Sequence, residues 1–358
     1  MDGSLAAVRA ANQLLHRPRG LSHPADIAMA ICGAQAQDLR HGRFAFRARC
    51  ATITAADVDR ARTEERSLVR TWAMRNTLHL VATEDVPWLM PLFEPRLAAF
   101  ARARLAQLGL DTRAQDKALK AIAKALGTEG PLSRTQLRER LRSQGLDMKG
   151  YAGGHVIGLS VAMGIAVEGP GDGAVPLLVD ARDWLGERPK HDRAAALAEL
   201  ARRYVRAFGP ATEHDFAKWS GLPLRDLRVG LSAIAAELRE VTVGKATLLA
   251  SRRASRRARG GVVRLLPAWD TYLMGYPDRG FMATPRRWRR ISDGGGGIAP
   301  AIAVDGMLEG TWSPGRRTET IGARARPFAR PGPAVRAAIR AELADIARFE
   351  GSPDAWPR

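Results

Sequence analysis

The sequence predicts a mixed α+β protein with three tandem winged-helix (helix-turn-helix) domains, followed by a small C-terminal β module and a terminal helix. The main observation is an internal repeat. Gly130-Pro131 and Gly209-Pro210 each precede a helix-capping residue, and each pair has an amphipathic helical segment upstream. Two further helical segments and short β-prone runs follow each pair. A similar order of helices and paired strands begins the chain, so one outline occurs three times.

The first winged helix is expected over residues 1–110. Ser22 is a capping residue and Pro24 is favoured in a first helical turn, so a helix should run from there to about Ala34. Thr54 should cap a later helix in the same way. The expected helices cover 24–34, 42–49, 55–62 and 84–108, and the expected strands cover 68–75 and 77–81.

The second domain is expected over residues 111–190 and the third over 191–266. Ser133 and Gln136 form an S-x-x-Q capping box, and Thr212 begins a looser version of the same device. The expected helices are 116–126, 133–142 and 151–163 in the second domain, and 192–208, 213–219 and 224–238 in the third. The β-prone runs at 165–179 and 241–266 should form the wings.

The pattern changes after the third domain, and residues 267–358 are expected to form a β-barrel-like module with a helix. Short β-prone runs at 298–304 and 307–312 follow a turn-forming run of glycines at 294–297. An amphipathic segment at 333–349 predicts the terminal helix.

Composition narrows the functional class. The chain has 358 residues, of which 46% are apolar and 26% charged, as in globular proteins. A formal net charge of +19 favours a polyanionic partner, nucleic acid before a membrane surface, although a generic basic surface of an arginine-rich protein explains the charge equally well. The N-terminus has no apolar signal core and no window is apolar enough to span a membrane, so a cytoplasmic protein is expected.

Several enzyme signatures are missing from the sequence. It contains no phosphate-binding loop and no nucleophile elbow. The seven histidines are scattered and the two cysteines are Cys32 and Cys50, with no metal-ligand spacing among them. We therefore expect no metal and no cofactor, and the two cysteines to be buried small hydrophobes.

The segment Cys32-Gly33-Ala34-Gln35-Ala36-Gln37-Asp38 is the candidate catalytic motif. It follows an apolar helical pattern, and Gly33 weakens the helix at this point. In extended or turn backbone, residues two apart share a side, so the amides of Gln35 and Gln37 should face one cavity. Two neutral amides can hold and orient a water molecule but cannot strongly deprotonate it. Such a site suits a reaction whose leaving group is already activated. The alternative is that the two glutamines are ordinary polar residues after a helix, and the surrounding segments decide against it.

Segments along most of the chain resemble the AlkZ/YcaQ family of bacterial winged-helix DNA glycosylases, and they occur in the family's order. They are Gln35-Ala36-Gln37-Asp38, Phe46-Arg47-Ala48-Arg49, the run from Thr71 to Leu80, Asp85-Val86-Pro87-Trp88-Leu89, the run from Leu265 to Tyr276, Val304-Asp305-Gly306 and Gly310-Thr311-Trp312. The resemblance implies a monofunctional DNA glycosylase in which Gln35 and Gln37 position the hydrolytic water. The Gln-x-Gln form resembles the branch linked to self-resistance against DNA-alkylating natural products.

The expected substrate is a cationic N7-alkylguanine, as a bulky adduct or an interstrand crosslink. Alkylation at N7 makes the base a good leaving group, so a strong general acid is not required. The expected partner is therefore double-stranded DNA containing alkylated purines, bound by a monomer. No lysine adjoins the Gln motif, which argues against Schiff-base lyase chemistry.

Basic residues supply the expected DNA contacts. Arginines between the two β-prone runs of the third repeat should form the tip of its wing: Arg252, Arg253, Arg256, Arg257, Arg259 and Arg264. The first five are predicted to bind DNA, and a solvated charged loop is the alternative. Arg75 and His79 are expected to line the DNA cleft through the family-like segment that contains them. His79 lies in an apolar strand, so a hydrogen-bonded core histidine is the alternative for this residue. Asn76 stands where the family usually has Gly, so either no positive φ is needed there or Asn supplies it.

Two other functions stay open from the sequence. Tandem winged helices with basic wings also suit a non-catalytic transcriptional regulator, although regulators usually gain specificity through dimeric symmetry. A structural DNA-binding protein is the third possibility. It would bind DNA without releasing any base.

Overall fold

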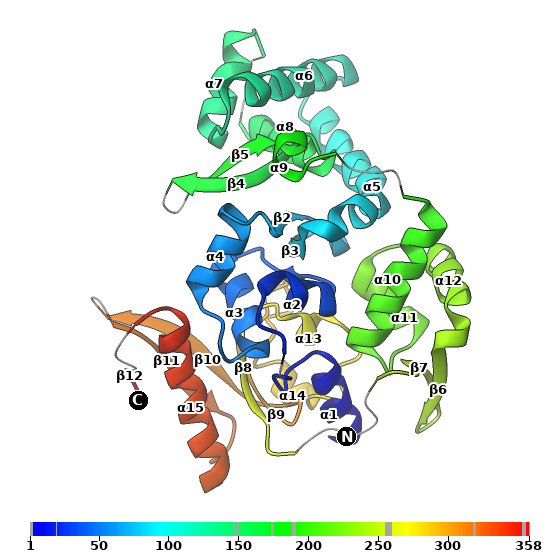
Figure 1. Cartoon of the computed structure of the whole chain (residues 1–358), viewed down its shortest axis with the longest axis vertical. Helices are drawn as coiled ribbons and strands as arrows, with labels where there is room; N and C mark the ends of the chain where they lie inside the picture. The colour runs from blue at the N-terminus through cyan, green and yellow to red at the C-terminus, as the bar shows by residue number, and fades with distance from the viewer. Residues whose placement is uncertain are drawn as a thin grey trace. The chain divides into compact units, whose positions relative to one another are not determined.

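The computed structural model describes residues 3–18, 20–146, 148, 150–172, 175–187, 191–254, 260–317, 320–352 and 356–357. The chain forms two compact units, one from Met1–Asp59 with Leu197–Arg358 and the other from Arg60–Ala196 (Figure 1). The four segments expected from the sequence follow the order of helices and hairpins along the chain, and as domains they stay a prediction.

The first unit begins with α1 (Gly3–Asn12), α2 (Pro24–Ala30), β1 (Ala34–Gln35), α3 (Leu39–Arg49) and α4 (Ala55–Thr63), the last of which continues into the second unit. His23 caps α2 in place of Ser22, because its ring nitrogen accepts from the amide of Ala25. The helix ends at Ala30, earlier than expected, and α3 begins earlier than expected, because the carboxylate of Asp38 caps it.

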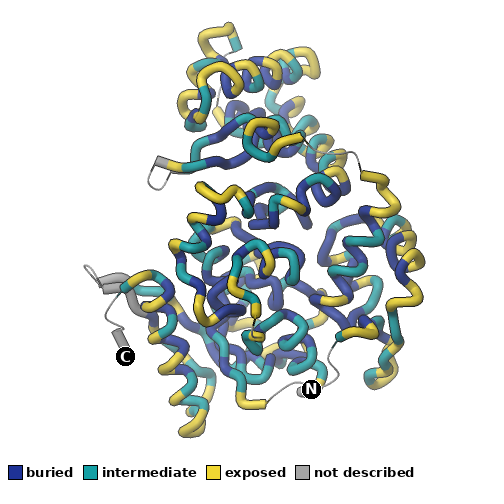
Figure 2. Tube along the Cα trace, in the orientation of Figure 1, coloured by how far each residue is buried: buried dark blue, intermediate teal, exposed yellow. Residues whose placement is uncertain are grey.

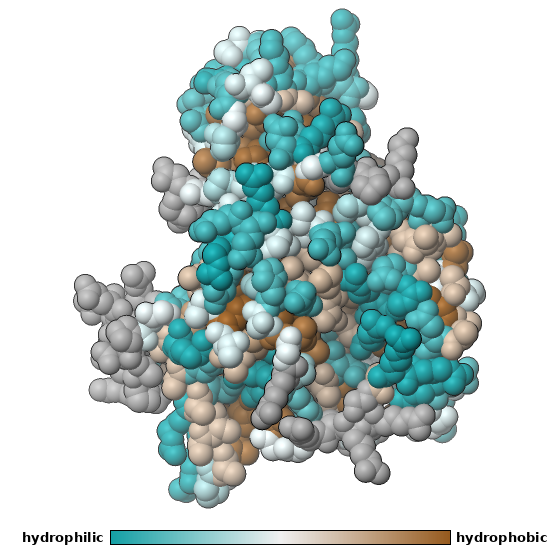
Figure 3. Space-filling model, viewed as in Figure 1, coloured by the Kyte–Doolittle hydropathy of each residue, from teal (hydrophilic) through white to brown (hydrophobic). Residues whose placement is uncertain are grey.

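The second unit contains two antiparallel hairpins and a layer of helices. Its elements are β2 (Leu68–Trp72), β3 (Leu78–Ala82), α5 (Val86–Gln107), α6 (Thr112–Glu129), α7 (Arg134–Ser143), α8 (Ala152–Ala162), β4 (Ala166–Asp172), β5 (Val175–Asp180) and α9 (Ala181–Leu185). The capping box of Ser133 and Gln136 is present at the start of α7. Apolar residues of α5, α6, α7 and α8 form one core, and the visible surface over α6 and α7 is mostly hydrophilic (Figure 3).

The turn between β2 and β3 answers the question raised by Asn76. Arg75 has a φ of 55° and Asn76 a φ of 57°, both in the left-handed region. Asparagine tolerates this region better than most residues, because its short side chain bonds locally. The turn therefore has a positive φ at this position, and Asn76 supplies it.

The first unit resumes with α10 (Arg193–Phe208), which continues from the second unit, α11 (Glu213–Ser220), α12 (Leu224–Ala233), β6 (Leu238–Val243) and β7 (Ala246–Ser251). Thr212 and Asp215 form the second capping box. The turn of the β6–β7 hairpin falls between Val243 and Ala246. Arg252 and Arg253 follow β7 at the opposite end of the hairpin, so the prediction that they occupy the tip of this wing is wrong.

The C-terminal part contains β8 (Val263–Leu266), α13 (Thr271–Met274), α14 (Pro285–Trp288), β9 (Ala301–Val304), β10 (Met307–Arg317), β11 (Thr320–Pro327), α15 (Pro333–Phe349) and β12 (Trp356–Pro357). Its sheet has the order β12-β11-β10-β9-β8. Assigning Val263–Leu266 to the third wing was wrong, because β8 pairs with β9 in this sheet. One face of α15 is buried and the other is exposed (Figure 2). No helix in the described ranges is long and apolar enough to cross a membrane.

Candidate active site

The Gln motif lies in the short segment that joins α2 to α3. Helix α2 stops because Cys32 and Gly33 both adopt positive φ, 58° and 83°. The amide of Gly33 donates to the carbonyl of Ala28 over 2.7 Å and closes the helix end. The chain then leaves in the extended conformation of β1, as the glycine in the motif led us to expect.

Two contacts from α3 hold this segment in place. A Cβ atom on Gly42 would lie 2.6 Å from the Cβ of Ala36, closer than any real contact, so only glycine allows this approach. The carboxylate of Asp38 accepts from the amide of His41 over 3.0 Å. The backbone between Gln35 and Gln37 is thus packed against the first turn of α3. The sequence contains no local signal for the role of Gly42.

The two amides differ in exposure. Gln35 is 7% exposed, whereas Gln37 is exposed to solvent. The side chain of Gln37 is therefore open to solvent, while that of Gln35 is enclosed by the protein. The expectation that both amides face one cavity stays a prediction.

His41 connects the motif to the family-like run from Leu265 to Tyr276. Its Nδ1 accepts from the amide of Ala268 over 3.3 Å, and its ring lies edge-on to Trp269 with centroids 6.4 Å apart. Burial lowers the pKa of His41, so the imidazole is neutral at neutral pH and serves as an acceptor. Trp269 donates from Nε1 to the carbonyl of Gly296 over 2.9 Å. Sequence reasoning did not find this pair, because the two residues are far apart in the chain.

The arginines of the Phe46-Arg47-Ala48-Arg49 segment hold the core together. Both are fully buried. Arg49 donates to both carboxylate oxygens of Asp270 over 2.9 Å, and Arg47 donates to Glu342 over 3.1 Å. A buried charge requires such partners. These ion pairs join α3 to the C-terminal part of the chain, and they position the Gln segment indirectly.

An arginine-lined cavity of about 590 Å³ lies beside the end of α2. Arg203, Arg206 and Arg253 contribute to its wall, together with Met29 and Ala30 at the end of α2. Arg203 donates to the carbonyl of Met29 over 3.2 Å. The cations outnumber the two carboxylates in the lining, which are those of Asp26 and Glu199. Arg203 also pairs with Glu199 over 2.7 Å. The cavity lies beside the helix that precedes the Gln segment, and we call it the arginine cavity.

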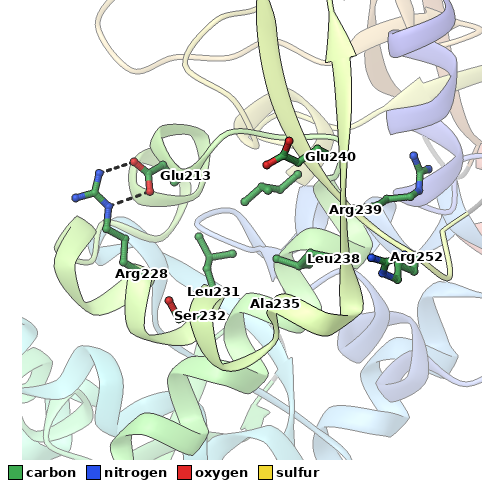
Figure 4. A pocket seen from close by; sticks show the side chains of 10 residues that line it. Glu213, Arg228, Leu231, Ser232, Ala235, Leu238, Arg239, Glu240 and Arg252 are labelled. Carbon is green, nitrogen blue, oxygen red and sulfur yellow. Dashed lines mark hydrogen bonds and ion pairs between the residues drawn. The ribbon is translucent and has the colours of Figure 1, made fainter.

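The structure shows where some of the predicted DNA-binding arginines lie. Arg252 is exposed and donates from Nε to the carbonyl of Ala236 over 3.1 Å. It lines a groove of about 540 Å³ between α11, α12 and the hairpin, in which Glu213 binds Arg228 (Figure 4). Arg253 lies in the arginine cavity.

The other predicted arginines are elsewhere. Arg256, Arg257 and Arg259 lie outside the described residues. Arg264 is in β8 of the C-terminal sheet, half-buried, and donates to Glu342 over 3.3 Å. Its inclusion in the wing was wrong, because the strand that carries it belongs to another sheet.

His79 and Arg75 belong to the second unit. His79 is 1% exposed, and its Nδ1 donates to the carbonyl of Thr77 over 3.0 Å. Burial lowers the pKa of His79 to about 3, so its ring is neutral at neutral pH and cannot pair with a phosphate as a cation. Arg75 is half-buried in the left-handed turn. That these residues line the DNA cleft stays a prediction.

Comparison with known proteins decides the family. The family profile described as DNA glycosylase AlkZ-like matches residues 29–349. The chain belongs to this family of DNA glycosylases. It is 27% identical over 314 residues to the interstrand DNA cross-link repair glycosylase of Streptomyces sahachiroi, covering 82% of this chain and 83% of that protein.

The fold also matches a solved structure. The DNA glycosylase AlkZ of Streptomyces sahachiroi superposes with a TM-score of 0.81 at 24% identity, over 99% of this chain and 98% of that one. The resemblance read from the sequence and the mixed α+β fold are confirmed. As a member of the AlkZ-like family the protein is a DNA N-glycosylase that acts on DNA, which decides against a non-catalytic regulator.

Proposed function

We propose that this AlkZ-like glycosylase excises cationic N7-alkylguanine from duplex DNA and that Gln35 and Gln37 position the water. The observation that carries the proposal is the rigid presentation of two neutral amides between α2 and α3, one of them open to solvent. The relative from Streptomyces sahachiroi is named for interstrand cross-link repair. Bulky adducts and crosslinks joined through N7 are therefore the proposed lesions.

The chemistry fits neutral amides for an electrostatic reason. The positive charge on an N7-alkylated base is neutralised as the glycosidic bond breaks, so the leaving group needs no strong acid. The sugar becomes an oxocarbenium-like cation, and amide carbonyl oxygens stabilise developing positive charge without a reorganisation cost. An amide can also orient a water molecule through its acceptor and donor atoms. The motif has no carboxylate at the position of either amide, and the neighbouring carboxylate of Asp38 caps α3.

The lysines of the chain support hydrolysis without a Schiff base. No lysine occurs before Lys117, and none occurs after Lys245. In the first unit the lysines are Lys218 and Lys245, on α11 and in the turn of the β6–β7 hairpin. Neither lies on the elements that carry the Gln motif. A covalent imine with the sugar is therefore not part of the proposed mechanism.

A panel of duplexes with single defined lesions tests the substrate class. We expect release of N7-methylguanine and N3-methyladenine, and separation of the two strands of an N7-linked crosslink by cleavage of its glycosidic bond, because all three lesions carry a fixed positive charge. Uracil and 1,N6-ethenoadenine should stay in the DNA, since they lack the charge and the motif lacks an acid worth about 10²–10⁴-fold in rate. Strand cleavage should require mild alkali after the reaction. Efficient release of uracil, or strand cleavage without alkali, would contradict the mechanism.

The DNA contacts proposed for Arg252 and Arg253 are tested by salt dependence. Each phosphate that a variant no longer neutralises should lower the log–log salt slope of duplex binding by about 0.9. The Arg252→Ala, Arg253→Ala variant should therefore bind every duplex more weakly and with a shallower slope. Arg60→Ala is the matched control, because Arg60 is exposed but paired with Glu65 over 3.0 Å. An unchanged slope in the double variant would show that these arginines face solvent in the complex.

A further inference from the structure

The second unit contains a cavity that no part of the proposed mechanism uses. It has a volume of about 380 Å³ and lies between α5, α7 and α8. Its wall is mainly apolar, and it includes Trp72, Phe100, Tyr151, Arg134, Arg138 and His155. We call it the aromatic cavity. Its size falls in the range of small-ligand sites in proteins.

Two aromatic side chains of this cavity are exposed. Phe100 is 65% exposed and Tyr151 is 80% exposed. In the described part of the chain the exposed large hydrophobic residues are these two and Val229, so two of them lie at one cavity. Single exposed apolar residues are common, but grouped aromatic ones at a concave surface indicate a binding site.

Two arginines add positive charge to the same cavity. Arg134 and Arg138 are one turn apart on α7, so their like charges lie on one face of the helix. Among the described residues no carboxylate pairs with either of them. Arg140 on the same helix is different, because Glu129 binds it through two hydrogen bonds of 2.9 and 2.8 Å. The cavity thus keeps two guanidinium groups available for an anion.

Two glycines make room for Arg138 on α8. A Cβ on Gly153 would lie 3.1 Å from Nε of Arg138, and one on Gly154 would lie 3.2 Å from its Nη2. Consecutive glycines weaken a helix, so their presence here requires a reason. They let the side chain of Arg138 approach α8 closely, at the cavity that Tyr151 also lines. The position of Arg138 is therefore built into the helix packing.

We propose that the aromatic cavity binds an unpaired stretch of a DNA strand. A base stacks on Tyr151 or Phe100, and the adjoining phosphate binds Arg134 and Arg138. Stacking on aromatic rings tolerates every base, because each base has a π-face, and guanidinium groups pair well with phosphate oxygens. A purely apolar ligand would leave both charges unused. The proposal requires only that the protein acts on DNA, and it is independent of the roles of Gln35 and Gln37.

Binding of a short single-stranded oligonucleotide that contains 2-aminopurine tests this proposal. Emission of the probe should fall on binding to the full-length protein, because stacking on an aromatic ring quenches it. Tyr151→Ala and Phe100→Ala should weaken binding by about 5- to 150-fold for each base that no longer stacks, and quenching should decrease. Arg134→Ala with Arg138→Ala should lower the salt slope by about 0.7 for each single-strand phosphate that is no longer bound.

Matched variants distinguish stacking from a structural role. Tyr151→Trp should keep both affinity and quenching, since it retains an aromatic face. Arg140→Ala should leave both unchanged, because Arg140 already binds Glu129. Excision of N7-methylguanine from a duplex by the parent protein is measured separately. Loss of excision would contradict the proposed function, whereas loss of the predicted oligonucleotide binding would contradict only the role of the aromatic cavity. Unchanged affinity and unchanged quenching in Tyr151→Ala and Phe100→Ala would overturn the proposal, and so would a fall in thermal stability with unchanged binding.

Discussion

Replacing Gln35 and Gln37 together by alanine is expected to abolish base excision from N7-methylguanine duplexes. Removing one preorganised group that stabilises charge in a transition state typically lowers the rate about 10²–10³-fold, and this variant removes both. The exposed amide of Gln37 should contribute under about 0.5 kcal/mol to stability. Replacing Gln35 by alanine is expected to lower the free energy of unfolding by about 1–3 kcal/mol, because Gln35 is buried. Single-turnover excision and thermal unfolding measure the two effects.

A second variant keeps both amides and moves them. In Gly42→Ala the new methyl group would lie 2.6 Å from the Cβ of Ala36, so the segment between the two glutamines must shift. Excision should fall while binding of undamaged duplex DNA is retained.

Full excision activity in the variant that lacks both Gln35 and Gln37 would refute the catalytic assignment. Full activity in Gly42→Ala alone would show that the position of the segment is not critical.

Asp270→Ala is expected to destabilise the protein by about 3–5 kcal/mol, because it leaves the guanidinium of Arg49 buried without its charge partner. Arg49 and Asp270 are both completely buried and are joined by two hydrogen bonds of 2.9 Å. Gln13 and Thr271 also accept from Arg49, and they cannot neutralise it. Urea unfolding followed by circular dichroism measures the loss of stability.

Two further variants test whether the loss of stability comes from the buried ion pair or from substitution in general. Glu129→Ala breaks an exposed pair with Arg140 and should hardly change the unfolding midpoint, because solvent screens such pairs. The combination Arg49→Met with Asp270→Leu should be less destabilising than Asp270→Ala, since no buried charge remains. A loss below about 1 kcal/mol in Asp270→Ala would mean that the pair does not hold α3 to the C-terminal part.

The sequence alone determined most of the longer helices, the two capping boxes and the family. Ser133 with Gln136 and Thr212 with Asp215 form capping boxes in the structure, as their spacing predicts. The last helix has the predicted bounds, Pro333–Phe349. These features depend on residues within a few positions of one another, so the pattern of side chains is sufficient to predict them. The end of α2 is also locally determined, because Gly33 adopts a positive φ just after the helix.

Only the tertiary structure decided which distant segments meet. Strand β8 pairs with β9, so Arg264 belongs to the C-terminal sheet and not to the wing. Arg49 forms an ion pair with Asp270, which is more than two hundred residues away in the chain. The approach of Gly42 to Ala36 and the grouping of Phe100 with Tyr151 also depend on packing between elements. Strand pairing and close packing are set by contacts between residues remote in the chain, and local periodicity carries no information about them.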